Sequence, residues 1–185
     1  MKKLTLSQLI FAAICCDMGL FAKKLIGPAA NIVTESLHIP GGIATSFSLM
    51  FLVVAAAILR CNGCATVMAV VQSILAFAFG MTGSMGALAP IGYILPGIVI
   101  DVCLFISQKI SQDTSSGIMP ASVASSVCAA LVANLLVFRL TGIILAVYVL
   151  VAATSGAICF VIASILVKRL IPVLYPQTQK ERNAT

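Results

Sequence analysis

The sequence predicts an all-α integral membrane protein with six transmembrane helices and both termini in the cytoplasm. Three observations predict this fold class: the apolar composition, the length of the apolar runs, and the distribution of Lys and Arg. Of the 185 residues, 61% are hydrophobic and 9% are charged, and the mean hydropathy is +1.17. Soluble domains average about 45–50% apolar and about 25% charged residues. The chain therefore lacks the polar surface that a soluble globule requires.

The apolar runs have the length of membrane-spanning helices, about 20 residues, and lack the alternation of membrane barrel strands. A chain of 185 residues has room for about six such helices with short connections, so we expect one domain over residues 1–185. The predicted spans cover residues 5–26, 41–59, 65–80, 87–106, 119–138 and 142–167.

The first span follows two lysines and superficially resembles a signal peptide. Asp17 interrupts its apolar run and no small-residue cleavage site precedes Lys23, so we expect a retained helix. A polar connection, residues 27–40, leads to the second span. The third span begins after a short turn that contains Cys61 and Cys64.

Three further connections separate the later spans. Small residues form the segment 81–86, polar residues form the stretch 107–117, and a turn at 139–141 precedes the sixth span. A polar tail begins at Tyr175. Small and polar residues of this kind are typical of the turns between apolar helices.

The Lys and Arg residues are divided unequally between the two sides of this arrangement. Eight lie on the side of the termini: Lys2, Lys3, Arg60, Lys109, Lys168, Arg169, Lys180 and Arg182. Three lie on the other side: Lys23, Lys24 and Arg139. The positive-inside rule places the richer side in the cytoplasm. The connection at 27–40 and the turn at 139–141 then face outward.

Polar side chains in and above the outer half of the bundle are candidates for a substrate-binding site, because polar groups are costly in a membrane. The candidates are Asp17, Asn31, Glu35, His38, Gln72, Tyr93, Asn134, Arg139 and Tyr148. The connection at 27–40 either folds back as a lid over a small polar ligand or is a solvated loop.

Five of these candidates also have a purely structural interpretation. Asp17 would pair with a neighbouring helix, and Gln72 would form a hydrogen bond between helices. Tyr93 and Tyr148 would anchor their helices at the membrane surface, and Arg139 would be an ordinary flanking charge. The sequence leaves these alternatives open.

Three further features concern Asp101 and the small residues of two spans. Asp101 in the fourth span is expected to pair with a cation such as Arg60 or Lys109. Small residues lie on the first span at Ala12, Ala13 and Cys16. A small-residue stripe on the third span consists of Ala65, Ala69, Ser73, Ala76 and Gly80. Small residues let helices approach closely, either within this protein or at the surface of another membrane protein.

The inventory of reactive residues argues against an enzyme. His38 is the only histidine, no group of His and carboxylate residues forms a metal site, and no nucleotide-binding motif occurs. Most of the seven cysteines lie in apolar runs, and the pair Cys61 and Cys64 stands alone on the reducing side. We expect no catalytic residue, no metal and no cofactor in this chain. No cluster of basic and aromatic residues indicates a nucleic acid partner.

Several motifs resemble those of the substrate-binding S components of energy-coupling factor (ECF) transporters, which are ABC transporters. They are LHIPGG at 37–42, residues 47–52, NGCAT at 62–66, Gly80 with Gly83 and Gly86, and YILPGIVID at 93–101. The Pro-Gly-Gly entry to the second span and the Leu-Pro-Gly-x-x-x-Asp run of the fourth are the most specific together. The similarity covers most of the chain.

The resemblance implies a multi-pass protein of a bacterial or archaeal cell membrane that captures a vitamin or related micronutrient from outside. It also implies partners: a transmembrane coupling subunit and two cytoplasmic ATPase subunits, which use ATP to drive uptake. In that family an Ala-x-x-x-Ala pattern in the first helix docks onto the coupling subunit. Here Ala12 and Cys16 have this spacing, with Cys in place of the second Ala. If the pattern starts at Ala13 instead, its second small position is occupied by Asp17.

The sequence leaves the ligand open, because Asp17 and Glu35 would favour a cationic molecule and Arg139 an anionic one. The absence of Trp argues against a site built on tryptophan stacking. The alternative function is a stand-alone secondary transporter or channel for a small polar solute, and a third is a structural membrane protein. A channel needs a polar stripe through the whole bilayer, whereas these polar residues gather at one side.

Overall fold

The computed structural model of the protein describes residues 5–36, 43–81, 83–110, 114–138 and 142–174. Within these ranges the chain forms six α-helices and no strand, which confirms the predicted all-α class there. The helices are α1 (Leu6–Ser36), α2 (Ile43–Leu59), α3 (Cys64–Ala78), α4 (Ala89–Ile110), α5 (Thr114–Ala133) and α6 (Ile143–Leu174). A 3₁₀ helix, η1 (Gly83–Leu88), precedes α4, and a π-helical turn, η2 (Asn134–Phe138), follows α5.

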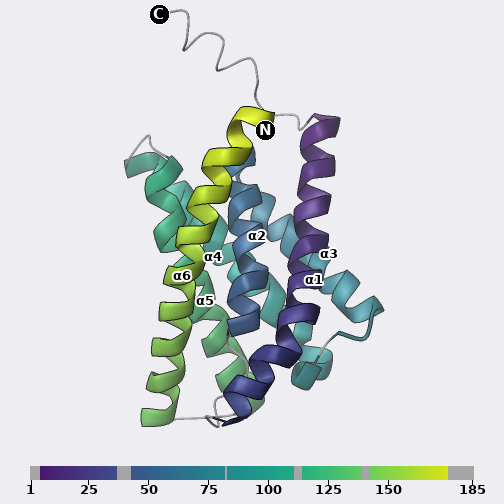
Figure 1. Ribbon diagram of the computed structural model, residues 1–185, viewed down its shortest axis with the longest axis vertical. Coiled ribbons are helices and arrows are strands. Elements are labelled where there is room, and N and C mark those ends of the chain that lie inside the picture. The colour runs from purple at the N-terminus through teal and green to yellow at the C-terminus, as the bar shows by residue number, and fades with distance from the viewer. Residues whose placement is uncertain (1–4, 37–42, 82, 111–113, 139–141, 175–185) are drawn as a thin grey trace, which may run out of the picture.

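The helices form a bundle around α2, which packs against each of the other five α-helices. The sequence of α2 suits this position, because its second half, residues 49–59, contains no polar side chain. Its eight residues from 52 to 59 are each at most 3% exposed. The start of α1 and the end of α6 lie at the same end of the bundle, at the top of Figure 1. The opposite end contains the end of α1 and the start of α2.

The bundle has large apolar side chains on its outside, and its mainly apolar interior also contains polar side chains. Large hydrophobic residues are exposed along several helices, among them Phe21 on α1, Phe77 on α3, Val102 on α4 and Leu150 on α6. The buried polar residues are Ser46, Ser48, Gln72, Ser73, Ser122, Ser125, Ser126, Asn134 and Ser155. This arrangement suits a lipid environment, where an apolar exterior costs nothing and interior polar groups bind helices together.

Three helical segments are long and apolar enough to cross a membrane: Gly86–Ile110, Gly117–Leu136 and Leu145–Pro172. The apolar parts of α2 and α3, Ala44–Leu59 and Cys64–Ala78, are shorter. α1 is long enough but contains four charged residues, Asp17, Lys23, Lys24 and Glu35. These features are those of an all-helical membrane protein. The predicted crossing of the membrane by all six helices stays a prediction.

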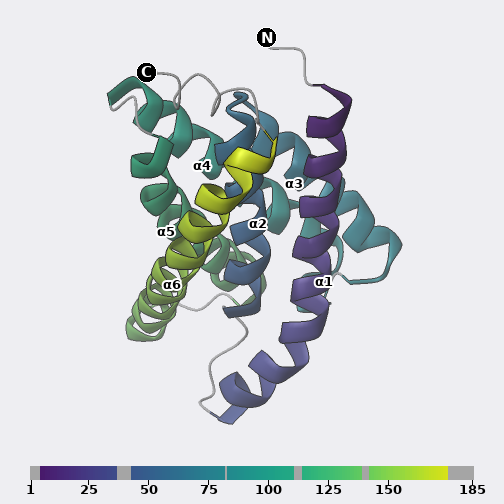
Figure 2. The ribbon, with the colours of Figure 1, turned by 45° about the horizontal axis from the view of Figure 1, so that its top comes forward.

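The predicted connection at 27–40 is wrong over most of its length, because α1 continues as a helix to Ser36. Pro28 lies inside the helix and removes only the hydrogen bond that its amide would donate to the carbonyl of Lys24. α1 bends in its second half (Figure 2), as expected near a proline. As a consequence, Lys23 and Lys24 lie within the helix and not at its end.

Other boundaries also differ from the predicted ones. η1 occupies most of the segment predicted as a loop at 81–86. α4 extends to Ile110 and α5 begins at Thr114, so the polar stretch 107–117 is largely helical. α6 runs to Leu174, beyond the predicted end at 167. A helix that leaves the apolar layer keeps its backbone hydrogen bonds, so hydropathy alone does not locate its end.

The expected ion pair between Asp101 and Arg60 or Lys109 is wrong. The Asp101 carboxylate accepts hydrogen bonds from the backbone amides of Ala65 (3.1 Å) and Thr66 (2.7 Å) and from the Thr66 hydroxyl (2.6 Å). These amides belong to the first turn of α3, where they lack partners within the helix and where the helix dipole is positive. Asp101 therefore caps α3 from α4.

The small-residue stripe of the third span packs inside the protein. Ala65, Ala69, Ser73 and Ala76 are buried, whereas Gly80 is exposed in the turn that follows α3. On the facing helix, a Cβ atom added to Gly97 would lie 2.5 Å from the Ala69 Cβ, so only glycine permits this approach of α4 to α3. Packing within the protein, one of the two alternatives, is confirmed for the buried members.

Candidate functional site

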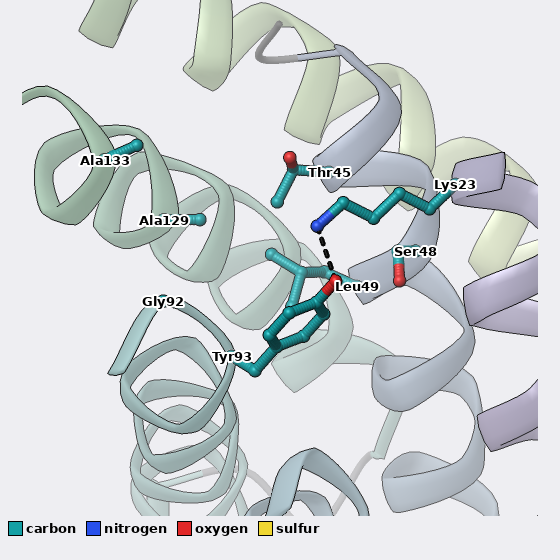
Figure 3. A pocket seen from close by; sticks show the side chains of 8 residues that line it. All are labelled: Lys23, Thr45, Ser48, Leu49, Gly92, Tyr93, Ala129 and Ala133. Atoms are coloured by element: carbon teal, nitrogen blue, oxygen red, sulfur yellow. Dashed lines mark hydrogen bonds between the residues drawn. The ribbon is translucent and has the colours of Figure 1, made fainter. Parts of the chain in front are cut away.

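A pocket lies between α1, α2, α4 and α5, in the half of the bundle away from the start of α1 and the end of α6. Its volume is about 50 Å³. The described residues that line it are Lys23, Thr45, Ser48, Leu49, Gly92, Tyr93, Ala129 and Ala133 (Figure 3). The position follows from the elements, since α2 and α4 begin near this end and α5 finishes there.

Lys23 and Tyr93 meet across this pocket. The Lys23 ammonium donates a hydrogen bond to the Tyr93 hydroxyl, with 2.7 Å between Nζ and Oη, and Nζ lies 4.3 Å from the centroid of the ring. Figure 3 shows the lysine reaching from α1 towards the tyrosine of α4. A phenol oxygen and an aromatic face both stabilise a cation, but neither carries a negative charge. Among the described residues, the site therefore solvates the positive charge of Lys23 without neutralising it.

Two hydroxyl groups of α2 also line the pocket. Thr45 and Ser48 are three residues apart, so they lie on one face of the helix. Ser48 is 3% exposed, and its Oγ is buried without a hydrogen-bond partner among the described residues. Buried polar atoms are nearly always paired, so an unpaired hydroxyl beside a cavity indicates space for a ligand or a water molecule.

Small residues on the other two helices leave the space open. Gly92 on α4 and Ala129 and Ala133 on α5 face the pocket. Directly after Ala133 the backbone changes to the π-helical turn η2, and Asn134 donates from Nδ2 to the carbonyl of Ala130 at 2.8 Å. π-helical turns occur frequently at functional sites.

Of the predicted substrate-binding residues, Tyr93 lines this pocket. Gln72 is fully buried between α1 and α3, and its Nε2 donates to the Cys16 carbonyl at 2.9 Å. The hydrogen bond between helices, which was the structural alternative for Gln72, is thus confirmed. Gly19 makes room for it, because a Cβ atom there would lie 2.5 Å from Gln72 Nε2.

The other described candidates are not among the residues that line the pocket. Asp17 is exposed on the surface of α1, and Tyr148 is buried on α6. Asn134 is buried one residue beyond Ala133. Asn31 and Glu35 lie in the last turns of α1, and their side chains are outside the described part of the structure. His38 and Arg139 lie outside the described residues altogether.

Sequence reasoning missed Lys23, Thr45 and Ser48. Lys23 lies three residues before the predicted end of the first span at Ile26, so the sequence indicated a flanking charge. A lysine well inside a membrane helix would instead indicate a functional site. The two hydroxyls carried no such signal, since serine and threonine are common in apolar helices.

The predicted docking residues of α1 face in different directions. Cys16 is buried against α3, with its Sγ 3.5 Å from the Met68 carbonyl oxygen, and Ala12 is half-buried against the core. Ala13 is exposed. The side chains of Ala12 and Cys16 therefore pack inside the protein. The Ala13 side chain is the one of the three that a partner could contact.

No group of three or more His, Cys, Asp and Glu side chains that could hold a metal ion occurs among the described residues. All seven cysteines are free thiols. No family model, curated protein or solved structure matches the chain. Its function is therefore inferred from the residues and their geometry.

Proposed function

We propose that this chain is the membrane-embedded substrate-capture subunit of an ECF transporter. In this role it binds a vitamin or a related micronutrient from outside the cell. Its partners are a transmembrane coupling subunit and two cytoplasmic ATPase subunits, which hydrolyse ATP to drive uptake. The chain itself needs no cofactor, and its location is the cell membrane of a bacterium or archaeon. The motifs at 37–42 and 93–101 support this assignment by their resemblance to S components.

The topology that accompanies this proposal has six crossings with both termini inside. α3 has 15 residues and a length of about 22 Å, less than the hydrocarbon thickness of about 30 Å. The turn after Ala78 and η1 complete its crossing. The shared end of α1 and α6 in Figure 1 is compatible with an even number of crossings.

The observation that carries the proposal is the one-sided pocket around Lys23 and Tyr93. A capture subunit needs a polar cavity that opens towards one face of the membrane. Towards the other end of the bundle, large apolar side chains are packed without exposure, including Ile100 and Ile118. This packed layer favours a binding subunit over a channel, which would need a polar path through both halves.

The proposal is tested by co-expressing the tagged chain with an ECF coupling subunit and its two ATPases. We expect the four proteins to purify together in detergent. Native mass spectrometry of the chain purified alone is expected to detect a retained small molecule that is lost on partial denaturation. A chain that never associates with a coupling module and transports solute alone in vesicles is a secondary transporter, the alternative function.

A further inference from the structure

We propose that the pocket binds the carboxylate group of the ligand, with Lys23 as its counter-ion and the hydroxyls of Tyr93 and Ser48 as hydrogen-bond donors. The proposal rests on the proposed function in one respect, namely that the ligand of the pocket is the captured substrate. It assigns the chemical class of the ligand, which the sequence left open.

The charge of Lys23 favours an anionic ligand. None of the described residues that line the pocket is acidic, so the ammonium has no counter-ion there. Asp17 on the same helix is exposed at the surface and does not line the pocket. Glu35 is about 18 Å further along α1 by the rise of the helix. A cation in a partly enclosed site attracts an anion much more strongly than it would in water.

The geometry of the Lys23 and Tyr93 pair suits a carboxylate group. Tyr93 Oη accepts the hydrogen bond from Lys23, so the proton of its own hydroxyl is available to a ligand. The two donor atoms are 2.7 Å apart and come from facing helices. Two donors at this spacing suit the two oxygens of one carboxylate, and hydrogen bonds between charged groups are the strong ones.

The Ser48 hydroxyl offers the pocket a further hydrogen-bonding group. Its Oγ lines the pocket and is buried without a partner among the described residues. A ligand oxygen would complete its hydrogen bonding, and a methyl or methylene group would not. The site thus supplies a charge and two hydroxyl donors from three different helices.

The volume limits what the pocket accepts. A water molecule requires at least about 10–15 Å³ of such space, so about 50 Å³ holds three or four groups of that size. A carboxylate with one attached carbon fits, whereas the rest of a larger ligand would have to displace side chains at the edge of the pocket. Acetate is therefore a suitable probe, and acetamide is its uncharged match in size and shape.

The test uses the full-length chain in detergent with ¹³C-labelled tyrosine. The chain has three tyrosines, and the Tyr93 ring signal is assigned by its absence in Tyr93→Phe. We expect acetate to shift the Tyr93 signal in a saturable manner and acetamide to leave it unchanged. Equal responses to the two probes, no response to acetate, or a response to inorganic phosphate alone would overturn the proposal.

Variants identify the group that responds. Lys23→Met should weaken acetate binding at least about tenfold, and Ser48→Ala should weaken it several-fold. Lys24→Met is the matched control, because Lys24 is the exposed neighbour on the same helix, and it should bind acetate normally. Undiminished binding to folded Lys23→Met and Ser48→Ala proteins would overturn the assignment.

The result is independent of the partners, because only the single chain is used. If acetate does not bind but the chain assembles with the coupling module, the carboxylate assignment fails and the proposed function stands. If acetate binds as expected but no assembly occurs, the anion site stands and the proposed function fails.

Discussion

Asp101 of α4 and Thr66 of α3 are joined by two hydrogen bonds to a single carboxylate oxygen. Oδ2 accepts from the Thr66 amide at 2.7 Å and from the Thr66 hydroxyl at 2.6 Å, while Oδ1 accepts from the Ala65 amide at 3.1 Å. The short turn before α3 has no side-chain cap of its own, because its N-cap position is Gly63. A residue distant in sequence therefore performs the capping.

Replacement of this carboxylate should destabilise the junction of α3 and α4. We expect Asp101→Ala to lower the free energy of unfolding by about 1–2 kcal/mol, since N-cap losses are of that size and two amides lose their partner. Thermal unfolding of the purified chain in detergent measures the effect. Asp17→Ala removes the same charge from an exposed site and should change the midpoint little. Equal midpoints for the two variants would show that the cap contributes no stability.

Gly19 and Gly27 provide a second matched pair, both on α1. A Cβ atom at Gly19 would lie 2.5 Å from Gln72 Nε2 and 3.1 Å from the Ser48 carbonyl oxygen, whereas nothing lies within 4 Å of one at Gly27. Gly19→Ala should therefore cost about 1–3 kcal/mol of stability through overpacking. Gly27→Ala should be neutral or stabilising by up to about 1 kcal/mol, because alanine favours a helix. The reverse order of thermal midpoints would contradict this packing.

The all-helical class and the approximate positions of the apolar helices could be predicted from the sequence. Hydropathy and the run lengths near 20 residues are averages over many residues, so they tolerate local exceptions. The end of the first helix could not be predicted, because Pro28 is a strong local signal that the helix nevertheless accommodates. Because of this one boundary, Lys23 is predicted near the end of a helix but lies in the interior of α1.

The candidate site was predictable only in part. Tyr93 was identified as a polar residue in the outer part of its span, and it lines the pocket. Gln72 and Asp101 gave equally strong polar signals, but they hold helices together. Residue type and depth do not distinguish these roles, since the distinction depends on which helix face meets which neighbour. Serine at position 48 gave no signal, because its significance lies in the lack of a hydrogen-bond partner among the described residues.

Filling the pocket should abolish ligand retention. Ala133→Phe places a large ring where the end of α5 borders the cavity, so the retained small molecule should disappear from native mass spectra. Ala157→Phe is the control, because Ala157 is exposed on the outside of α6 and its ring would face lipid. Retention of the ligand by a folded Ala133→Phe protein would show that the ligand binds elsewhere.

Tryptophan substitutions distinguish the exposed Ala13 from the buried Cys16 as contact residues for the coupling subunit. Ala13→Trp should leave stability and acetate binding unchanged but prevent co-purification with the coupling subunit, because Ala13 is exposed. Cys16→Trp should instead destabilise the chain alone, because Cys16 is buried against Met68 of α3. Normal assembly of Ala13→Trp with the coupling subunit would exclude this face as the docking surface.

Uptake of the molecule identified by native mass spectrometry separates a capture subunit from a secondary transporter. The measurement compares proteoliposomes that contain the chain alone with proteoliposomes that contain the chain, the coupling subunit and the two ATPases. We predict accumulation only with the complete complex and ATP, and its loss in Lys23→Met but not in Lys24→Met. Accumulation by the chain alone under an ion gradient would contradict the account, because it would make the protein a secondary transporter.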